Sequence, residues 1–142
     1  MLKEILPEIL KDTKFEKDEN YMASYNDKTD KITFDKKRIM NNIDFNMILQ
    51  MYFHKKMSRK EILLIVLLHE LGHRYSFLQK IDNKDQYDID WQNMYKKHGI
   101  GHITKWNLAY WQEIRGEREA MTFAKEYFFR YRLKEIIKRC LK

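Results

Sequence analysis

The sequence contains few of the residues that crosslink or interrupt a chain. Its 142 residues include one cysteine, Cys140, one proline and four glycines. A single cysteine cannot form an intramolecular disulfide, which fits a reducing compartment, and any metal site must use histidine and carboxylate side chains. Because proline and glycine are scarce, no linker is evident, and we expect residues 1–142 to form one domain.

Long apolar runs are also absent. No run reaches the roughly 20 residues that a membrane-spanning helix needs. The first ten residues, "MLKEILPEIL", carry charges where a signal peptide would be apolar. We therefore expect a cytoplasmic protein that does not contact a membrane.

The formal net charge is +7, and much of it lies in a basic helical tail from about residue 125, which ends "RYRLKEIIKRCLK". Apolar residues recur there at helical spacing, which favours a solvated helix face. Contact with nucleic acid is the alternative. No zinc-finger spacing or phosphate-binding glycine loop accompanies the charge, so we do not expect nucleic acid as the main partner.

Periodicity predicts mixed helix and strand. Residues 21–35 alternate around a polar turn and indicate a β-hairpin, whereas residues 82–103 are polar and without a sustained period, which indicates a loop with at most a short helix. Apolar residues at helical spacing predict helices over 2–12, over 42–56 and from about 104 to the end, with a break or kink near Gly116.

The strongest helix signal is "SRKEILLIVLLHELGH". Ser58 can cap the first backbone amides, and Glu61 three residues later completes a capping box. The residues from Ile62 to Leu68 are apolar on every side, so this helix should run through the interior of the domain.

His69 and His73 lie four residues apart on that helix. They are offset by about 40° around the axis and about 6 Å along it, so both imidazoles face the same way and could bind one zinc ion. Glu70 projects from the adjacent flank and is placed to act as general base on a zinc-bound water. Each histidine alone would more often be an ordinary core or surface residue. Burying all three polar groups without partners would be costly, which favours a metal site.

A third ligand must come from elsewhere in the chain, because Ser76 and Gln79 stand where the metzincin pattern has glycine and histidine. The candidates are His98 and His102 in "HGIGH", or a glutamate in "EIRGEREAMTFA". Two glycines between the histidines argue against a rigid helical pair. His98 and His102 are therefore also candidates for substrate contact or oxyanion stabilisation.

"HELGH" followed by "EREAMTFAKEYF" resembles the ImmA/IrrE family of small zinc metallopeptidases, which are related to the minigluzincins. The resemblance covers roughly residues 20–130. The second family motif is matched by Glu117, Ala120, Phe123 and Ala124, whereas Met121 replaces the usual asparagine. The resemblance implies a zincin-like fold with Glu117 as third zinc ligand. It also implies a phage or mobile-element context, in which family members cleave repressors.

Two features depart from the family pattern, namely a longer insert between His73 and Glu117 and the basic tail. The insert could build its own substrate pocket, although aromatic residues at helical spacing more often belong to a core. The aromatic residues concerned are Trp91, Tyr95, Trp106, Tyr110 and Trp111.

The other glutamates are separated by helix geometry. On an unbroken helix Glu113 and Glu117 share a face, whereas Glu119 points about 160° away from Glu117. Ala120 and Ala124 would let the glutamate helix approach the histidine helix closely. Glu113 is then either a hydrogen-bond acceptor for a zinc-binding imidazole or a solvated carboxylate.

These patterns predict a single α+β domain, in which a small, mainly antiparallel sheet packs on an active-site helix and a glutamate helix. The predicted function is that of a gluzincin-type zinc metallopeptidase that hydrolyses a protein or peptide substrate. The alternative from another class is a regulatory or binding module whose zinc is not catalytic and whose basic tail contacts nucleic acid.

Overall fold

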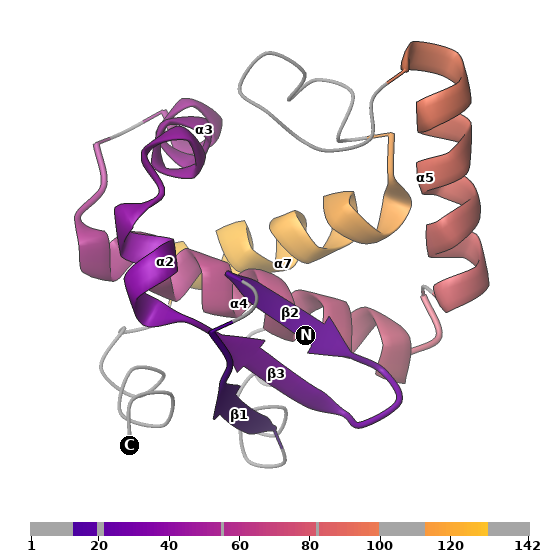
Figure 1. Ribbon diagram of the computed structural model, residues 1–142, viewed down its shortest axis with the longest axis horizontal. Helices are drawn as coiled ribbons and strands as arrows, with labels where there is room; N and C mark the ends of the chain where they lie inside the picture. The colour runs from indigo at the N-terminus through magenta and orange to yellow at the C-terminus, as the bar shows by residue number, and fades with distance from the viewer. Residues whose placement is uncertain (1–12, 20–21, 55, 82, 100–112, 131–142) are drawn as a thin grey trace.

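The computed structural model describes residues 13–19, 22–54, 56–81, 83–99 and 113–130, and these form an α+β fold (Figure 1). The helix predicted over 2–12 lies outside the described residues. The elements are strands β1 (Lys14–Lys17), β2 (Ala23–Asn26) and β3 (Lys31–Phe34), and helices α2 (Lys36–Asn41), α3 (Ile43–Phe53), α4 (Arg59–Leu78), α5 (Lys84–His98) and α7 (Arg115–Arg130).

The sheet has the strand order β1-β3-β2. Strands β2 and β3 are antiparallel, so the hairpin prediction is confirmed. Strand β1 is parallel to β3, and the expectation of a mainly antiparallel sheet was wrong because the sheet is mixed. The sequence "KFEK" contains one apolar residue, Phe15, whose ring packs edge-on against Phe34 of β3. One apolar residue in four is too weak an alternation to predict a strand.

Helix α4 forms the centre of the core. Ser58 Oγ accepts a hydrogen bond from the Glu61 N–H at 3.1 Å, and the Glu61 carboxylate accepts one from the Ser58 N–H at 3.0 Å, so the predicted capping box is present. All residues from Ile62 to Leu68 are buried. In Figure 1 the sheet lies in front of α4, and α7 runs beside it.

Two described helices, α2 and α3, lie between β3 and α4, where the sequence indicated one. Helix α3 lies within the predicted range of 42–56. Helix α2 was not predicted, although its start has a capping residue: Asp35 Oδ1 accepts hydrogen bonds from the N–H groups of Lys37 and Arg38. With one buried residue, Ile39, helix α2 is too short to show a clear apolar period.

Residues 84–98 form the full helix α5, so the prediction of a loop with at most a short helix was wrong. Most of its residues are exposed and Met94 is its one residue classed as buried, which leaves little apolar period in the sequence. The boundary signals were nevertheless present. Asn83 caps the start by accepting from the Gln86 N–H, and Gly99 ends the helix with a φ of 69°.

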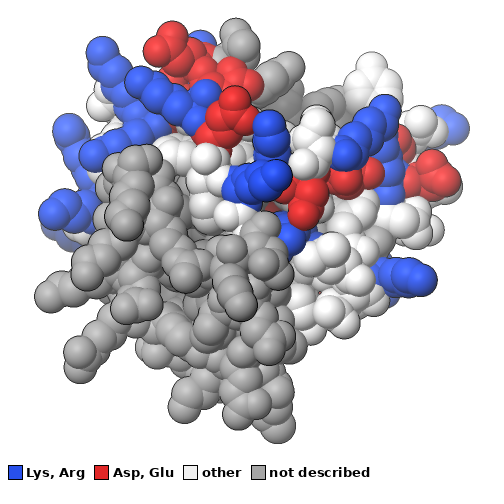
Figure 2. Space-filling model, turned by 90° about the horizontal axis from the view of Figure 1, so that it is seen from below, with Lys and Arg blue, Asp and Glu red and all other residues white. Residues whose placement is uncertain are grey.

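Helix α7 begins at Arg115, close to the expected break. Residues 113 and 114, which the prediction also placed in this helix, form a turn before it, and 104–112 lie outside the described residues, as does the basic tail beyond residue 130. Figure 2 shows lysine, arginine and acidic side chains interspersed on the described part of one face. Nucleic-acid contact through the tail therefore stays a prediction.

Helices α4 and α7 pack closely at Gly72. A Cβ atom at residue 72 would lie 2.7 Å from the carbonyl oxygen of Ala120 and 3.0 Å from the Cβ of Phe123. Ala120 and Ala124 are fully buried. The expected close approach of the two helices through small residues is thus observed. Among the described residues, no helix is both long and apolar enough to cross a membrane.

Candidate metal centre

The two histidines of "HELGH" turn the same ring atom toward one point. His69 Nε2 and His73 Nε2 are 3.2 Å apart, and the rings meet edge to face with centroids 4.7 Å apart. Both side chains are largely buried, with exposed fractions of 12% and 10%. One turn of α4 therefore places two nitrogen donors side by side inside the protein.

Helix α7 adds a carboxylate to this pair. Glu117 Oε2 lies 2.9 Å from His69 Nε2, and Glu117 Oε1 lies 3.4 Å from His73 Nε2. Glu117 precedes Ala120 by three residues and His69 precedes Gly72 by three, so both groups lie about one turn from the contact between Gly72 and Ala120. The close packing at Gly72 is what brings the carboxylate within reach of the imidazoles.

The three side chains fit the donor set of a zinc site. Their candidate ligand atoms all lie within 4.8 Å of one another, and no other such group occurs among the described residues. Bonds of 2.0–2.1 Å in a tetrahedral arrangement would separate neighbouring donors by about 3.3 Å. The distances from His69 Nε2 to His73 Nε2, 3.2 Å, and to Glu117 Oε2, 2.9 Å, lie close to that value. Imidazole and carboxylate donors are also those that zinc accepts in proteins.

The charge on Glu117 is stabilised by the same neighbours. Burial raises the pKa of Glu117, but the facing imidazoles of His73 and His69 outweigh burial and hold the pKa well below its usual value. A buried carboxylate held in its anionic form is suited to binding a cation.

Glu70 is buried beside this cluster. Burial raises the pKa of Glu70, whereas His73, His69 and a hydrogen bond from the Tyr25 backbone N–H act in the opposite direction. The two glutamates therefore differ in their acid-base character, because Glu117 faces the imidazoles and Glu70 is dominated by the loss of water.

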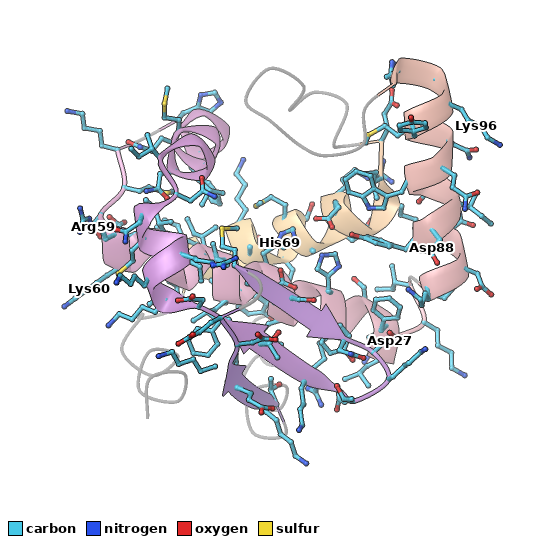
Figure 3. The ribbon with its side chains drawn as sticks, in the orientation of Figure 1. Asp27, Arg59, Lys60, His69, Asp88 and Lys96 are labelled. Atoms are coloured by element: carbon cyan, nitrogen blue, oxygen red, sulfur yellow. The ribbon has the colours of Figure 1, made fainter. Side chains whose placement is uncertain are left out.

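A cleft of ≈ 240 Å³ gives access to these groups. It is bounded by β2, the end of α4, the start of α5 and α7. Figure 3 shows His69 near the middle of the molecule, whereas Arg59, Lys60 and Lys96 lie at its periphery. The residues that line the cleft are Ala23, Ser24, Tyr25, Asp27, Glu70, His73, Phe77, Lys84, Tyr87 and Glu117.

Tyr87 of α5 was not predicted to be a site residue. Its hydroxyl donates a hydrogen bond to Glu117 Oε1 at 2.6 Å, and its ring packs edge-on against His73 with centroids 5.9 Å apart. Burial and the neighbouring Glu117 carboxylate raise the pKa of Tyr87. Tyr87, Trp91 and Met94 recur at helical spacing, and with the caps Asn83 and Gly99 this spacing was the available signal for a helix facing the site.

Arg74, the residue after His73, was also missed. Its guanidinium donates two hydrogen bonds to Asp30 in the hairpin turn, Nε to Oδ1 at 2.8 Å and Nη2 to Oδ2 at 3.0 Å. Asp30 Oδ1 also accepts from the Tyr25 hydroxyl at 2.9 Å. Arg74 thereby ties the hairpin to the helix that carries the histidines.

The remaining candidates lie apart from the cluster. Glu113 Oε2 pairs with His98 Nε2 at 3.0 Å and Oε1 with Lys97 Nζ at 3.5 Å, rather than with a zinc-binding imidazole. The sequence argument assumed one helix through Glu113 and Glu117, but α7 begins between them. Neither His98 nor Glu113 lines the cleft.

Of the aromatic candidates, Trp91 is half-buried beside Tyr87, and Tyr95 is exposed. The candidates His102, Trp106, Tyr110 and Trp111 lie outside the described residues.

No protein-family model, curated protein or solved structure matches this chain. The resemblance to the ImmA/IrrE family therefore stays a prediction that depends on its two short motifs.

Proposed function

We propose that this protein is a zinc-dependent peptidase with a zincin-like, ImmA/IrrE-related architecture. In this proposal His69, His73 and Glu117 hold the zinc ion, and Glu70 is the general base. The observation that carries the proposal is that Glu70, His73 and Glu117 line the same cleft. A substrate entering it would reach the proton acceptor and the metal-binding side chains together.

The chemistry divides between the metal and the chain. Bound zinc would supply Lewis acidity, which polarises a carbonyl and acidifies water. Glu70 accepts a proton from the attacking water and delivers it to the nitrogen of the leaving amine, so one carboxylate both takes up and releases the proton. The Tyr25 N–H lowers the pKa of that carboxylate, in opposition to burial.

The ligand set favours a catalytic role over a structural one. Structural zinc sites usually use four protein ligands, whereas catalytic sites use three and leave one position open. Three candidate ligands occur here among the described residues, and two of them line a cleft. A site that only stabilised the fold would not need Glu70 beside it.

Strand β2 is suited to hold a peptide substrate. It is an edge strand in the order β1-β3-β2, and Ala23, Ser24 and Tyr25 line the cleft. Edge strands bind extended peptides through backbone hydrogen bonds. A segment of protein or peptide lying along β2 would run through the cleft that Glu70 and Glu117 also line.

The test combines metal content with hydrolysis of an unstructured protein. We expect about one zinc per chain in the purified protein and little in His69→Ala or His73→Ala. Glu70→Gln should keep zinc but lose hydrolysis by roughly 10²–10⁴-fold, because the amide cannot take the proton. Glu119→Gln is the matched control and should keep both.

Each of three results would overturn part of the proposal. Full zinc retention in both histidine variants would remove the metal site. Unchanged hydrolysis by Glu70→Gln would leave the metal site in place but remove the proposed base. Zinc binding without hydrolysis of any tested peptide would favour the non-catalytic binding module.

A further inference from the structure

The two oxygens of Glu117 have different surroundings. Oε2 faces His69 Nε2 at 2.9 Å. Oε1 accepts the Tyr87 hydroxyl at 2.6 Å, and its distance to His73 Nε2 is longer, at 3.4 Å. The hydroxyl on α5 therefore constrains one oxygen of a carboxylate whose other oxygen faces an imidazole.

The position of Tyr87 is itself well determined by its neighbours. Its ring packs edge-on against His73, with centroids 5.9 Å apart, and against Trp91, with centroids 6.4 Å apart. Asn83 caps α5 one turn earlier, which sets where the helix begins. Because the ring and the start of the helix are both held in place, little side-chain entropy is lost when the hydroxyl bonds to Glu117.

We propose that Tyr87 is a positioning residue of the metal centre, which holds Glu117 Oε1 so that Oε2 is the oxygen offered to the metal. This inference depends on the proposed function for the identity of the three ligands. Hydrogen bonds to ligating side chains orient the ligand and tune its basicity, and losing one typically lowers metal affinity by 10–100-fold.

Fixing one oxygen has a consequence for the chemistry. A carboxylate that is free to turn can engage a metal through both oxygens and take up the position that water or substrate needs. Tyr87 engages Oε1 and so favours binding through a single oxygen. The contact also links α5, which forms one wall of the cleft, to the glutamate helix α7.

The test is Tyr87→Phe, which keeps the ring that packs on His73 and Trp91 and removes only the hydroxyl. The control is Tyr95→Phe, the same change on the same helix at an exposed position. In competitive titrations of zinc against a chelator, we expect affinity to fall by roughly 10–100-fold for Tyr87→Phe and to be unchanged for Tyr95→Phe. The cobalt-substituted form should show an altered visible absorption spectrum in Tyr87→Phe alone, because the coordination by Glu117 changes.

A structural role for Tyr87 gives a different result. If Tyr87→Phe lowers the melting temperature of the metal-free protein but keeps the wild-type zinc affinity and cobalt spectrum, the positioning role is overturned. That outcome leaves the proposed function intact if wild type binds zinc and Glu70→Gln abolishes hydrolysis. If wild type binds neither metal, both proposals fail together.

Discussion

Gly72 and Ala120 lie in such close contact that a Cβ at residue 72 would stand 2.7 Å from the Ala120 carbonyl oxygen and 2.8 Å from its Cα. This contact lets α7 approach α4 closely. Glu117 can therefore reach the imidazoles of His69 and His73. The glycine of "HELGH" is therefore needed because it lacks a side chain, and not because of its conformational freedom.

Gly72→Ala should destabilise the protein. On an open helix face this change gains up to about 1 kcal/mol of helix propensity. Here the added methyl meets backbone atoms that cannot rotate away, and overpacking of this kind costs roughly 1–3 kcal/mol. Urea unfolding should show a lower free energy of unfolding, and zinc affinity should fall because α7 must move. Thr122→Ala, exposed on α7, is the control; a Gly72→Ala protein as stable as wild type would contradict the packing argument.

Glu117→Gln should lower zinc affinity more than Glu113→Gln or Glu119→Gln. Only Glu117 contacts both imidazoles, whereas Glu113 pairs with His98 and Lys97. We expect a loss for Glu117→Gln beyond the roughly 10–100-fold that follows loss of an outer hydrogen-bond partner. Zinc titration of the three variants decides the question. Tight binding by Glu117→Gln beside lost binding in either of the others would show that another carboxylate is the ligand.

Asp30→Asn should weaken the attachment of the hairpin to α4. The Arg74 side chain is 5% exposed, so the change leaves a buried cation without its carboxylate. Asp30 itself is partly exposed, and we expect a loss of about 1 kcal/mol in the free energy of unfolding. Urea unfolding at pH 7 measures it. Asp27→Asn, in the same turn and exposed, should have a smaller effect.

The loss caused by Asp30→Asn should depend on pH. Hydrogen bonding from Arg74 lowers the pKa of Asp30 below its ordinary value of 3.8, although burial opposes the shift. The stabilisation is then fully present above the ordinary carboxyl pKa and is lost as pH falls through the lower pKa of the folded state. The difference in unfolding free energy between wild type and variant should be constant from pH 8 to about 5 and should shrink toward pH 3. A difference that grows on acidification would contradict this pairing.

Ser58→Ala should shorten or fray the start of α4. The variant loses the side-chain oxygen that accepts the Glu61 N–H, which typically costs about 1 kcal/mol. Combining it with Glu61→Ala should cost less than the sum of the single changes, because the two halves of the capping box depend on each other. Chemical denaturation of wild type, the two single variants and the double variant measures this coupling. Strict additivity would show that the two hydrogen bonds of the capping box are independent.

Much of α4 was predictable because its determinants are local. The capping box, the buried run and the common face of His69 and His73 all follow from hydrogen bonding and a period of 3.6 residues within one segment. The hairpin of β2 and β3 was predictable for the same reason, since a polar turn joins two alternating segments. Strand β1 and helix α5 were not predicted, because few of their residues are buried and the apolar period is weak.

The sequence by itself determined the pair of imidazoles, the position of Glu70 beside them and the small residues that permit close helix packing. Tertiary structure decided which groups meet them. Glu117 reaches the pair because Gly72 lets α7 approach, Glu113 turns to His98 because α7 begins after it, and Tyr87 reaches Glu117 from α5. Arg74 and Asp30 meet across 44 positions of sequence. Spacing within a helix is set by neighbouring backbone hydrogen bonds, whereas contacts between elements depend on how whole surfaces pack.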